Sequence, residues 1–143
     1  MAENPFLAPV VALVGWTLIM MVWLYVLRLP ALGRAIDVKN WRGGTAAQIE
    51  ALLEPRVQWP AHNYNHLLEQ PTLFYAICLA LAVMDGGGGP NAWLAWAYVA
   101  LRIAHSLVQA LWNRVVVRFA LFALASVVLA MLTAHAALEL LHH

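Results

Sequence analysis

Four apolar stretches, each long enough to cross a lipid bilayer as a helix, constrain the fold of this chain more than any other feature. They cover about residues 9–27, 62–84, 91–111 and 115–141. A spanning helix needs about 20 mostly apolar residues because the hydrocarbon core is about 30 Å thick. The chain is 64% hydrophobic and only 10% charged, whereas soluble domains carry about 25% charged residues. We therefore predict an all-α integral membrane protein, with residues 1–143 forming one domain and one bundle of four transmembrane helices.

The basic residues predict how this bundle is oriented. They flank or fill the long connection 30–61 and the short connection between the last two spans, and are Arg28, Arg34, Lys39, Arg42, Arg56, Arg114 and Arg118. Cytoplasmic loops of membrane proteins are enriched in Lys and Arg, so we expect both connections in the cytoplasm and both termini outside it. Within the long connection, residues 45–53 predict a short helix. The plain loops favour a bacterial inner membrane, and the net charge of +1 gives no indication of a nucleic-acid partner.

The third span carries polar residues where a membrane helix should be apolar. At about 100° per residue, their spacing puts all of them within an arc of about 100°. These residues are Arg102, His105, Ser106, Gln109 and Asn113. An ionisable group in hydrocarbon costs about 2.5–3.5 kcal/mol on the insertion scale. Such a set is therefore expected to be paired or to serve a function.

The second span has a polar stripe of its own near its cytoplasmic end. Its members fall within an arc of about 120° and are His62, Asn65, His66, Glu69 and Thr72. We predict an ion pair between Glu69 and Arg102, because pairing lets both charges survive burial. Pro71 cannot donate a backbone hydrogen bond, so a kink is expected there.

Three interpretations of these stripes remain open from the residues alone. They are polar contacts that only hold helices together, a metal site, or a polar and basic cavity. His62 and His66 with Glu69 have helical spacing for zinc, but no third histidine fits the pattern, so no metal site is predicted. We favour a cavity between helices, open to the cytoplasm and suited to an anionic ligand.

The segment HNYNHLLEQPTLFY at residues 62–75 resembles the second-helix signature of the MAPEG family, the membrane-associated proteins in eicosanoid and glutathione metabolism. Arg102, His105 and Gln109 resemble the family's third-helix pattern Arg-x-x-His-x-x-x-Tyr, with glutamine in place of tyrosine. The resemblance implies a homotrimer that holds glutathione, as cosubstrate, in clefts between subunits near the cytoplasmic side. It also implies that a lipophilic small molecule or lipid reaches the thiol from the bilayer.

The resemblance also implies roles for individual residues. Arg118 matches the arginine that stabilises the glutathione thiolate, with Arg114 as its rival. The residues implied to bind the tripeptide are Asn65, His66, Glu69, Arg102, His105, Gln109, Arg28 and Arg34. His66 is the alternative to Asn65, because the family's best-known eukaryotic members space the asparagine and the acid three residues apart. Phe119 follows Arg118 where the family has a hydroxyl.

These assignments agree with the chemistry of glutathione, which carries two carboxylates, one ammonium group and a thiol. Arginines suit the carboxylates and a glutamate suits the ammonium group. A nearby guanidinium also increases the thiolate fraction of a thiol. The leading hypothesis is a glutathione-dependent membrane transferase or peroxidase acting on lipophilic electrophiles. The alternatives are a non-catalytic lipid-binding or scaffold protein of the same fold, and a small channel or transporter.

Overall fold

The computed structural model describes residues 4–35, 40, 48, 51–84 and 90–142. Four helical segments within them are long and apolar enough to cross a membrane. They are α1 (Leu7–Ala35), α3 (Pro55–Val83), α4 (Pro90–Leu107) with its π-helical extension η1 (Val108–Trp112), and α5 (Val115–His142). The prediction of an all-helical membrane fold is therefore confirmed. Lys39, Arg42 and most of the short helix predicted at residues 45–53 lie outside the described residues.

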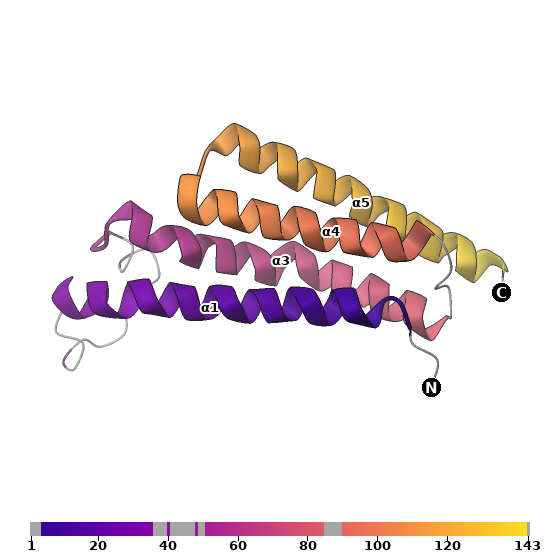
Figure 1. Cartoon of the computed structure of the whole chain (residues 1–143), viewed down its shortest axis with the longest axis horizontal. Helices are drawn as coiled ribbons and strands as arrows, with labels where there is room; N and C mark the ends of the chain where they lie inside the picture. Colours follow the sequence, from indigo (N-terminus) through magenta and orange to yellow (C-terminus); the bar gives the residue numbers. More distant parts are fainter. Residues whose placement is uncertain (1–3, 36–39, 41–47, 49–50, 85–89, 143) are drawn as a thin grey trace.

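The helices lie alongside one another as two pairs (Figure 1). α1 packs mainly against α3, and α4 packs mainly against α5. α1 begins and α5 ends at the same end of the bundle, and the α4–α5 connection lies at the other (Figure 1). Large apolar side chains from all four helices fill the interior, among them Leu13, Phe74, Tyr98 and Leu132. This interior holds α3, α4 and α5 together around the polar residues of α4.

The helix α1 continues beyond Arg28 and Pro30, where the sequence predicted the first span to stop. It ends at Ala35, with Pro30 inside it. Proline lacks a backbone N–H, which leaves the carbonyl four residues earlier without its helical partner. That residue, Val26, lies on the exposed side of the helix. A proline at such a position interrupts the hydrogen bonding without ending the helix, and a helix and a membrane span need not end at the same residue.

A tight connection joins the third and fourth helices. The last turn of the third helix is π-helical, over Val108–Trp112, and Asn113 follows in the left-handed conformation with φ of 56°. The Asn113 N–H donates to the Val108 carbonyl at 2.5 Å. Asparagine adopts the left-handed conformation more easily than most residues. This turn reverses the chain direction, so that α5 starts at Val115 and runs back along α4.

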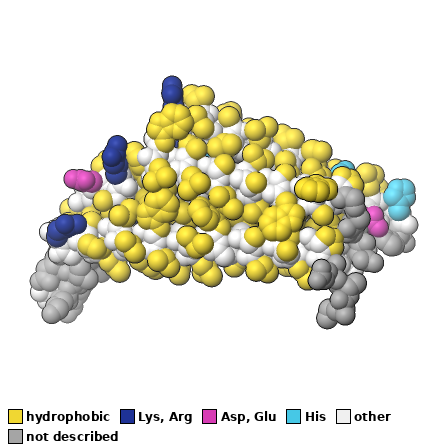
Figure 2. All heavy atoms as spheres, in the orientation of Figure 1, with side chains coloured by type: hydrophobic (Ala, Val, Ile, Leu, Met, Phe, Trp, Pro, Cys, Tyr) yellow, Lys and Arg dark blue, Asp and Glu magenta, His cyan; other side chains and the backbone are white. Residues whose placement is uncertain are grey.

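The surface is apolar over the middle of the bundle and charged near its ends (Figure 2). Exposed large apolar side chains, mostly leucine and valine, come from every helix. Arg side chains gather at the end where α1 finishes and α5 begins (Figures 1 and 2). Such a surface suits contact with lipid along the middle of the helices.

Candidate functional site

The polar residues of the third span lie inside the bundle. Arg102 and Ser106 are 0% exposed, Gln109 is 2% exposed and His105 is 3% exposed. α4 and η1 therefore turn this polar face away from lipid. Among the described residues, His105 Nδ1, Ser106 Oγ and Gln109 Oε1 have no hydrogen-bond partner. Unpaired polar atoms at this depth are costly, so the buried face is well suited to meeting a polar ligand.

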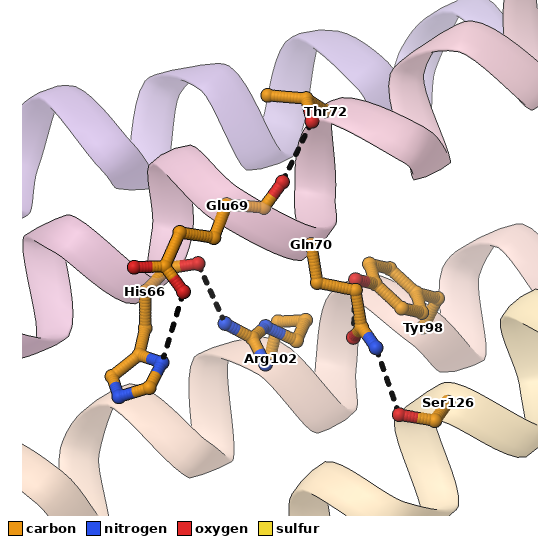
Figure 3. Close-up of polar contacts among 7 residues, drawn as sticks. All are labelled: His66, Glu69, Gln70, Thr72, Tyr98, Arg102 and Ser126. Carbon is orange, nitrogen blue, oxygen red and sulfur yellow. Dashed lines mark hydrogen bonds and ion pairs between the residues drawn. The ribbon is translucent and has the colours of Figure 1, made fainter.

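Arg102 is the arginine of this buried face, and a buried guanidinium needs partners for its charge and its N–H groups. Its Nη2 donates to the backbone carbonyl of His66 at 3.3 Å (Figure 3), and its guanidinium carbon lies 5.8 Å from the centre of the Phe122 ring. Within the described part of the chain, Nε and Nη1 have no partner. A buried guanidinium with two unpaired nitrogens attracts an anion.

The predicted ion pair between Glu69 and Arg102 is not formed. Glu69 instead lies beside His66, with Oε2 4.0 Å from Nδ1, and its side chain is 71% exposed (Figure 3). Glu69 sits toward the outside of α3, whereas Arg102 reaches the backbone of the same helix from inside the bundle. The two residues are close in depth but lie on different sides of α3.

A hollow lies between α3, α4 and α5, next to Arg102. Its volume is about 210 Å³, and its walls are His66, His105, Val115, Arg118, Phe119 and Phe122. The rings of His66 and His105 are 5.9 Å apart in an edge-on arrangement, and His105 also lies 6.4 Å from the Phe122 ring. The hollow therefore joins one arginine and two histidines to an apolar wall from α5.

The polar stripe of α3 only partly faces this hollow. His62 and His66 are partly buried, whereas Asn65, Glu69 and Thr72 are exposed on the outside of the bundle. Of the five residues of this stripe, all of which the structure describes, His66 lines the hollow and the other four do not. The Thr72 hydroxyl donates to the Glu69 carbonyl at 2.6 Å, which satisfies that hydroxyl within its own helix.

The other arginines proposed for the site lie elsewhere. Arg114 is exposed and lies over the Trp112 ring at 5.5 Å. Arg34 lines a separate hollow of about 440 Å³ between the end of α1 and the start of α3. Arg28 is partly buried on α1 and is not among the residues that line the α3–α4–α5 hollow. The structure thus brings Arg118, rather than Arg114, to the histidine pair.

Two further observations bear on metal binding and on residues that the sequence did not single out. Among the described residues, no group of three His, Cys, Asp or Glu side chains is arranged to hold a metal ion. Asn63 is 0% exposed, and neither its side-chain oxygen nor its nitrogen has a partner in the described chain. Asn63 belongs to the motif of residues 62–75, but helical spacing places it outside the polar stripe of α3, so nothing in the sequence pattern selected it.

A chain of hydrogen bonds below the hollow also escaped the sequence analysis. Tyr98 Oη donates to Gln70 Oε1 at 3.0 Å, and Gln70 Nε2 donates to Ser126 Oγ at 2.8 Å. The spacing offered a partial signal, because Gln70 follows His66 by four residues and Tyr98 precedes Arg102 by four. Only the structure aligns the two helices so that these residues meet.

The family model described as "MAPEG family" matches residues 6–138 of the chain. The chain belongs to the MAPEG family. The match covers every residue that lines the hollow, and MAPEG membership together with four helices able to span a membrane makes this an integral membrane protein. No curated protein and no solved structure matches the chain. MAPEG proteins are generally associated with glutathione and lipophilic substrates, so a glutathione-related function in a membrane is consistent with this membership.

Proposed function

We propose that this MAPEG protein is a glutathione-dependent transferase or peroxidase that acts on lipophilic electrophiles. The observation that carries the proposal is the hollow in which Arg118 meets His66 and His105, beside Arg102, of which two nitrogens have no partner among the described residues. Glutathione presents two carboxylates, which match buried or partly buried guanidinium groups. The hollow and its surroundings therefore have the charge that this tripeptide requires.

Each polar residue has a part in this proposal. Arg102, His105 and Gln109 bind the carboxylate groups of glutathione, with Arg28 and Arg34 as further candidates at the cytoplasmic end. Asn65 or His66, together with Glu69, bind its ammonium and amide groups. Arg118 stabilises the thiolate. A free thiol with a pKa of about 8.5 is mostly protonated at neutral pH, and a nearby guanidinium lowers that pKa and so increases the reactive thiolate fraction.

The apolar wall of the hollow supports a lipophilic second substrate. Val115, Phe119 and Phe122 form this wall, and Phe119 is 71% exposed on the surface of α5. An electrophile dissolved in the bilayer can approach from this side. In conjugation the glutathione sulfur forms a bond to an electrophilic carbon, and the leaving group departs with its bonding electron pair. Holding both partners together supplies much of the rate increase.

We also propose that the protein works as a homotrimer in a bacterial inner membrane, with both termini outside the cytoplasm. The exposed polar stripe of Asn65, Glu69 and Thr72 supports assembly, because polar side chains facing hydrocarbon are unfavourable. A second copy of the chain that covers this stripe brings Asn65 and Glu69 into a cleft between subunits. The gathering of Arg side chains at one end of the bundle supports the orientation.

A non-catalytic lipid-binding protein of the same fold is the second candidate. It is favoured by the three apolar residues of the hollow's wall and by Gln109, which stands where the family's third-helix pattern has tyrosine. In that case the arginines and histidines bind an anionic lipid headgroup, and no thiolate forms.

The test is a titration of purified protein with glutathione that follows thiolate absorbance and thermal stability together. We expect a saturable thiolate signal that Arg118→Ala abolishes and that Arg114→Ala, the matched control, retains. Stabilisation without thiolate would favour the lipid-binding candidate, with Arg118 a binding residue only. Full activity in Arg118→Ala would refute the proposed mechanism.

A further inference from the structure

Groups from α3, α4 and α5 meet in three layers below the cytoplasmic end, and successive layers are about one helical turn apart along α4 and α5. The first layer contains His66, His105 and Arg118, which line the hollow. In the second, Arg102 reaches the His66 carbonyl and lies against the Phe122 ring. The third contains Tyr98, Gln70 and Ser126 and is held by hydrogen bonds (Figure 3). The hollow therefore rests on a polar layer deeper in the bundle.

The hydrogen bonds of the third layer all run in one direction. The Tyr98 hydroxyl donates to the Gln70 carbonyl oxygen, the Gln70 amide donates to the Ser126 hydroxyl, and that hydroxyl donates to the Phe122 carbonyl at 2.8 Å. The amide of Gln70 thus uses its oxygen toward α4 and its nitrogen toward α5. A side chain with only a donor or only an acceptor cannot replace it.

Tyr98 is a fixed anchor for this chain of bonds. Its ring stacks on Phe74 with centroids 4.4 Å apart and an angle of 13° between the planes, and both residues are 0% exposed. The phenol therefore cannot swing away to find another partner. At this depth there is also little water to replace a broken hydrogen bond.

The α5 end of this chain of hydrogen bonds, at Ser126, is close in sequence to residues that line the hollow. Ser126, Phe122 and Arg118 are spaced four residues apart and share one face of α5. Phe122 is a wall of the hollow and also contacts Arg102 and His105. A contact that fixes Ser126 against α3 therefore fixes Phe122 and Arg118 relative to both histidines.

We propose that Gln70 is a positioning residue whose hydrogen bonds to Tyr98 and Ser126 set the place of α5, and hence of Phe122 and Arg118, at the hollow. The identity of the ligand in this inference rests on the proposed function. Gln70 does not line the hollow, so it acts through α5 rather than by touching glutathione.

The experiment compares Gln70→Met and Ser126→Ala with Thr133→Val. Thr133 is a matched control, because its hydroxyl also donates to the carbonyl four residues earlier on α5, at 2.9 Å, but it lies two turns beyond Ser126. The folded variants in detergent are titrated with glutathione while thiolate absorbance is followed. Hydrogen exchange of the α5 amides over residues 115–126 is measured without glutathione.

We expect Gln70→Met and Ser126→Ala to weaken glutathione binding by about three- to tenfold, the range given by interhelical hydrogen bonds in membranes. Thiolate absorbance at saturation should fall and exchange over residues 115–126 should be faster, whereas Thr133→Val should match the wild type. A purely structural role would lower thermal stability and leave the affinity of folded protein unchanged.

The inference is overturned if both folded variants bind glutathione within twofold of the wild type, whatever their exchange rates. Ser126→Ala leaves the Gln70 side chain and its partner Tyr98 unchanged, so it tests the inference even if Gln70→Met does not fold. If the wild-type protein itself does not bind glutathione, the proposed function fails and exchange alone decides. Faster exchange over residues 115–126 then supports the positioning role, and unchanged exchange refutes it.

Discussion

Replacing Arg102 with methionine should stabilise the protein without ligand and destabilise it relative to the wild type when glutathione is present. Arg102 is fully buried, yet Nε and Nη1 have no partner among the described residues. Methionine has similar length, is apolar and adapts to irregular space. The substitution therefore removes a poorly compensated charge while largely keeping the packing.

The magnitude follows from the contacts that Arg102 makes. Burying the guanidinium costs about 2.5–3.5 kcal/mol. The bond to the His66 carbonyl, at 3.3 Å, is longer than the usual range and contributes about 1 kcal/mol. The contact with Phe122 at 5.8 Å contributes about 0.5–1 kcal/mol. The balance leaves Arg102→Met more stable by about 1 kcal/mol, a rise in Tm of about 3 °C for a chain of this size.

With glutathione bound, the wild type should become more stable than Arg102→Met. At a concentration of about 100 times Kd, a ligand that binds only the folded state adds about 2.7 kcal/mol of stability. The wild type should gain this and Arg102→Met should gain little, because its anion-binding group is gone. Thermal unfolding in detergent, with and without glutathione, measures both effects, and Leu101→Met on the same helix controls for the new side chain.

The reasoning is refuted if Arg102→Met lowers ligand-free stability by more than about 2 kcal/mol, because the loss of one partner of a well-paired buried charge costs about 3–5 kcal/mol. It is also refuted if both proteins gain the same stability from glutathione. The first result would mean that Arg102 is paired within the assembled protein, and the second that glutathione binds elsewhere.

Three further predictions concern the turn, the hollow and the outer face of α3. Asn113→Gly should keep the stability of the wild type, whereas Asn113→Ala should lose about 1 kcal/mol in thermal unfolding, because a left-handed φ of 56° is accessible to glycine and asparagine but unfavourable for alanine. Val115→Trp should fill much of the 210 Å³ hollow and weaken glutathione binding at least about tenfold, a loss of about 1.4 kcal/mol, without lowering Tm; unchanged affinity would place the ligand elsewhere. Thr72→Trp, on the exposed stripe, should reduce the molecular mass measured by light scattering in detergent from that of a trimer to that of one chain, since an indole cannot fit in a packed contact; an unchanged mass would place the contact elsewhere.

Hydropathy alone predicted the four helices, because nothing but a helix satisfies the backbone within a long apolar segment in a bilayer. Spacing alone also predicted the shared face of Arg102, His105 and Gln109, since helical periodicity decides which residues lie together. Both predictions depend only on local geometry along one helix.

The contacts that the sequence did not predict depend on how one helix is rotated against another. Periodicity groups His66 with Glu69, but it does not say which edge of the stripe turns inward, and the structure turns His66 toward the hollow and leaves Glu69 exposed. The bond between Gln70 and Ser126 joins residues 56 positions apart. Such a contact requires two helices to be aligned in depth and rotation, and neither alignment can be predicted from the sequence of one segment alone.

The three layers also decide which changes in length this chain can tolerate. Deleting one residue between Arg118 and Ser126 would rotate the two residues by about 100° relative to each other, so that Arg118 could not face the hollow while Ser126 faces Gln70. A deletion there would therefore abolish several interactions at once, whereas a substitution removes only one. During evolution, insertions and deletions are consequently expected to be confined to the connections between helices, while the spacing within residues 66–70, 98–105 and 118–126 stays constant.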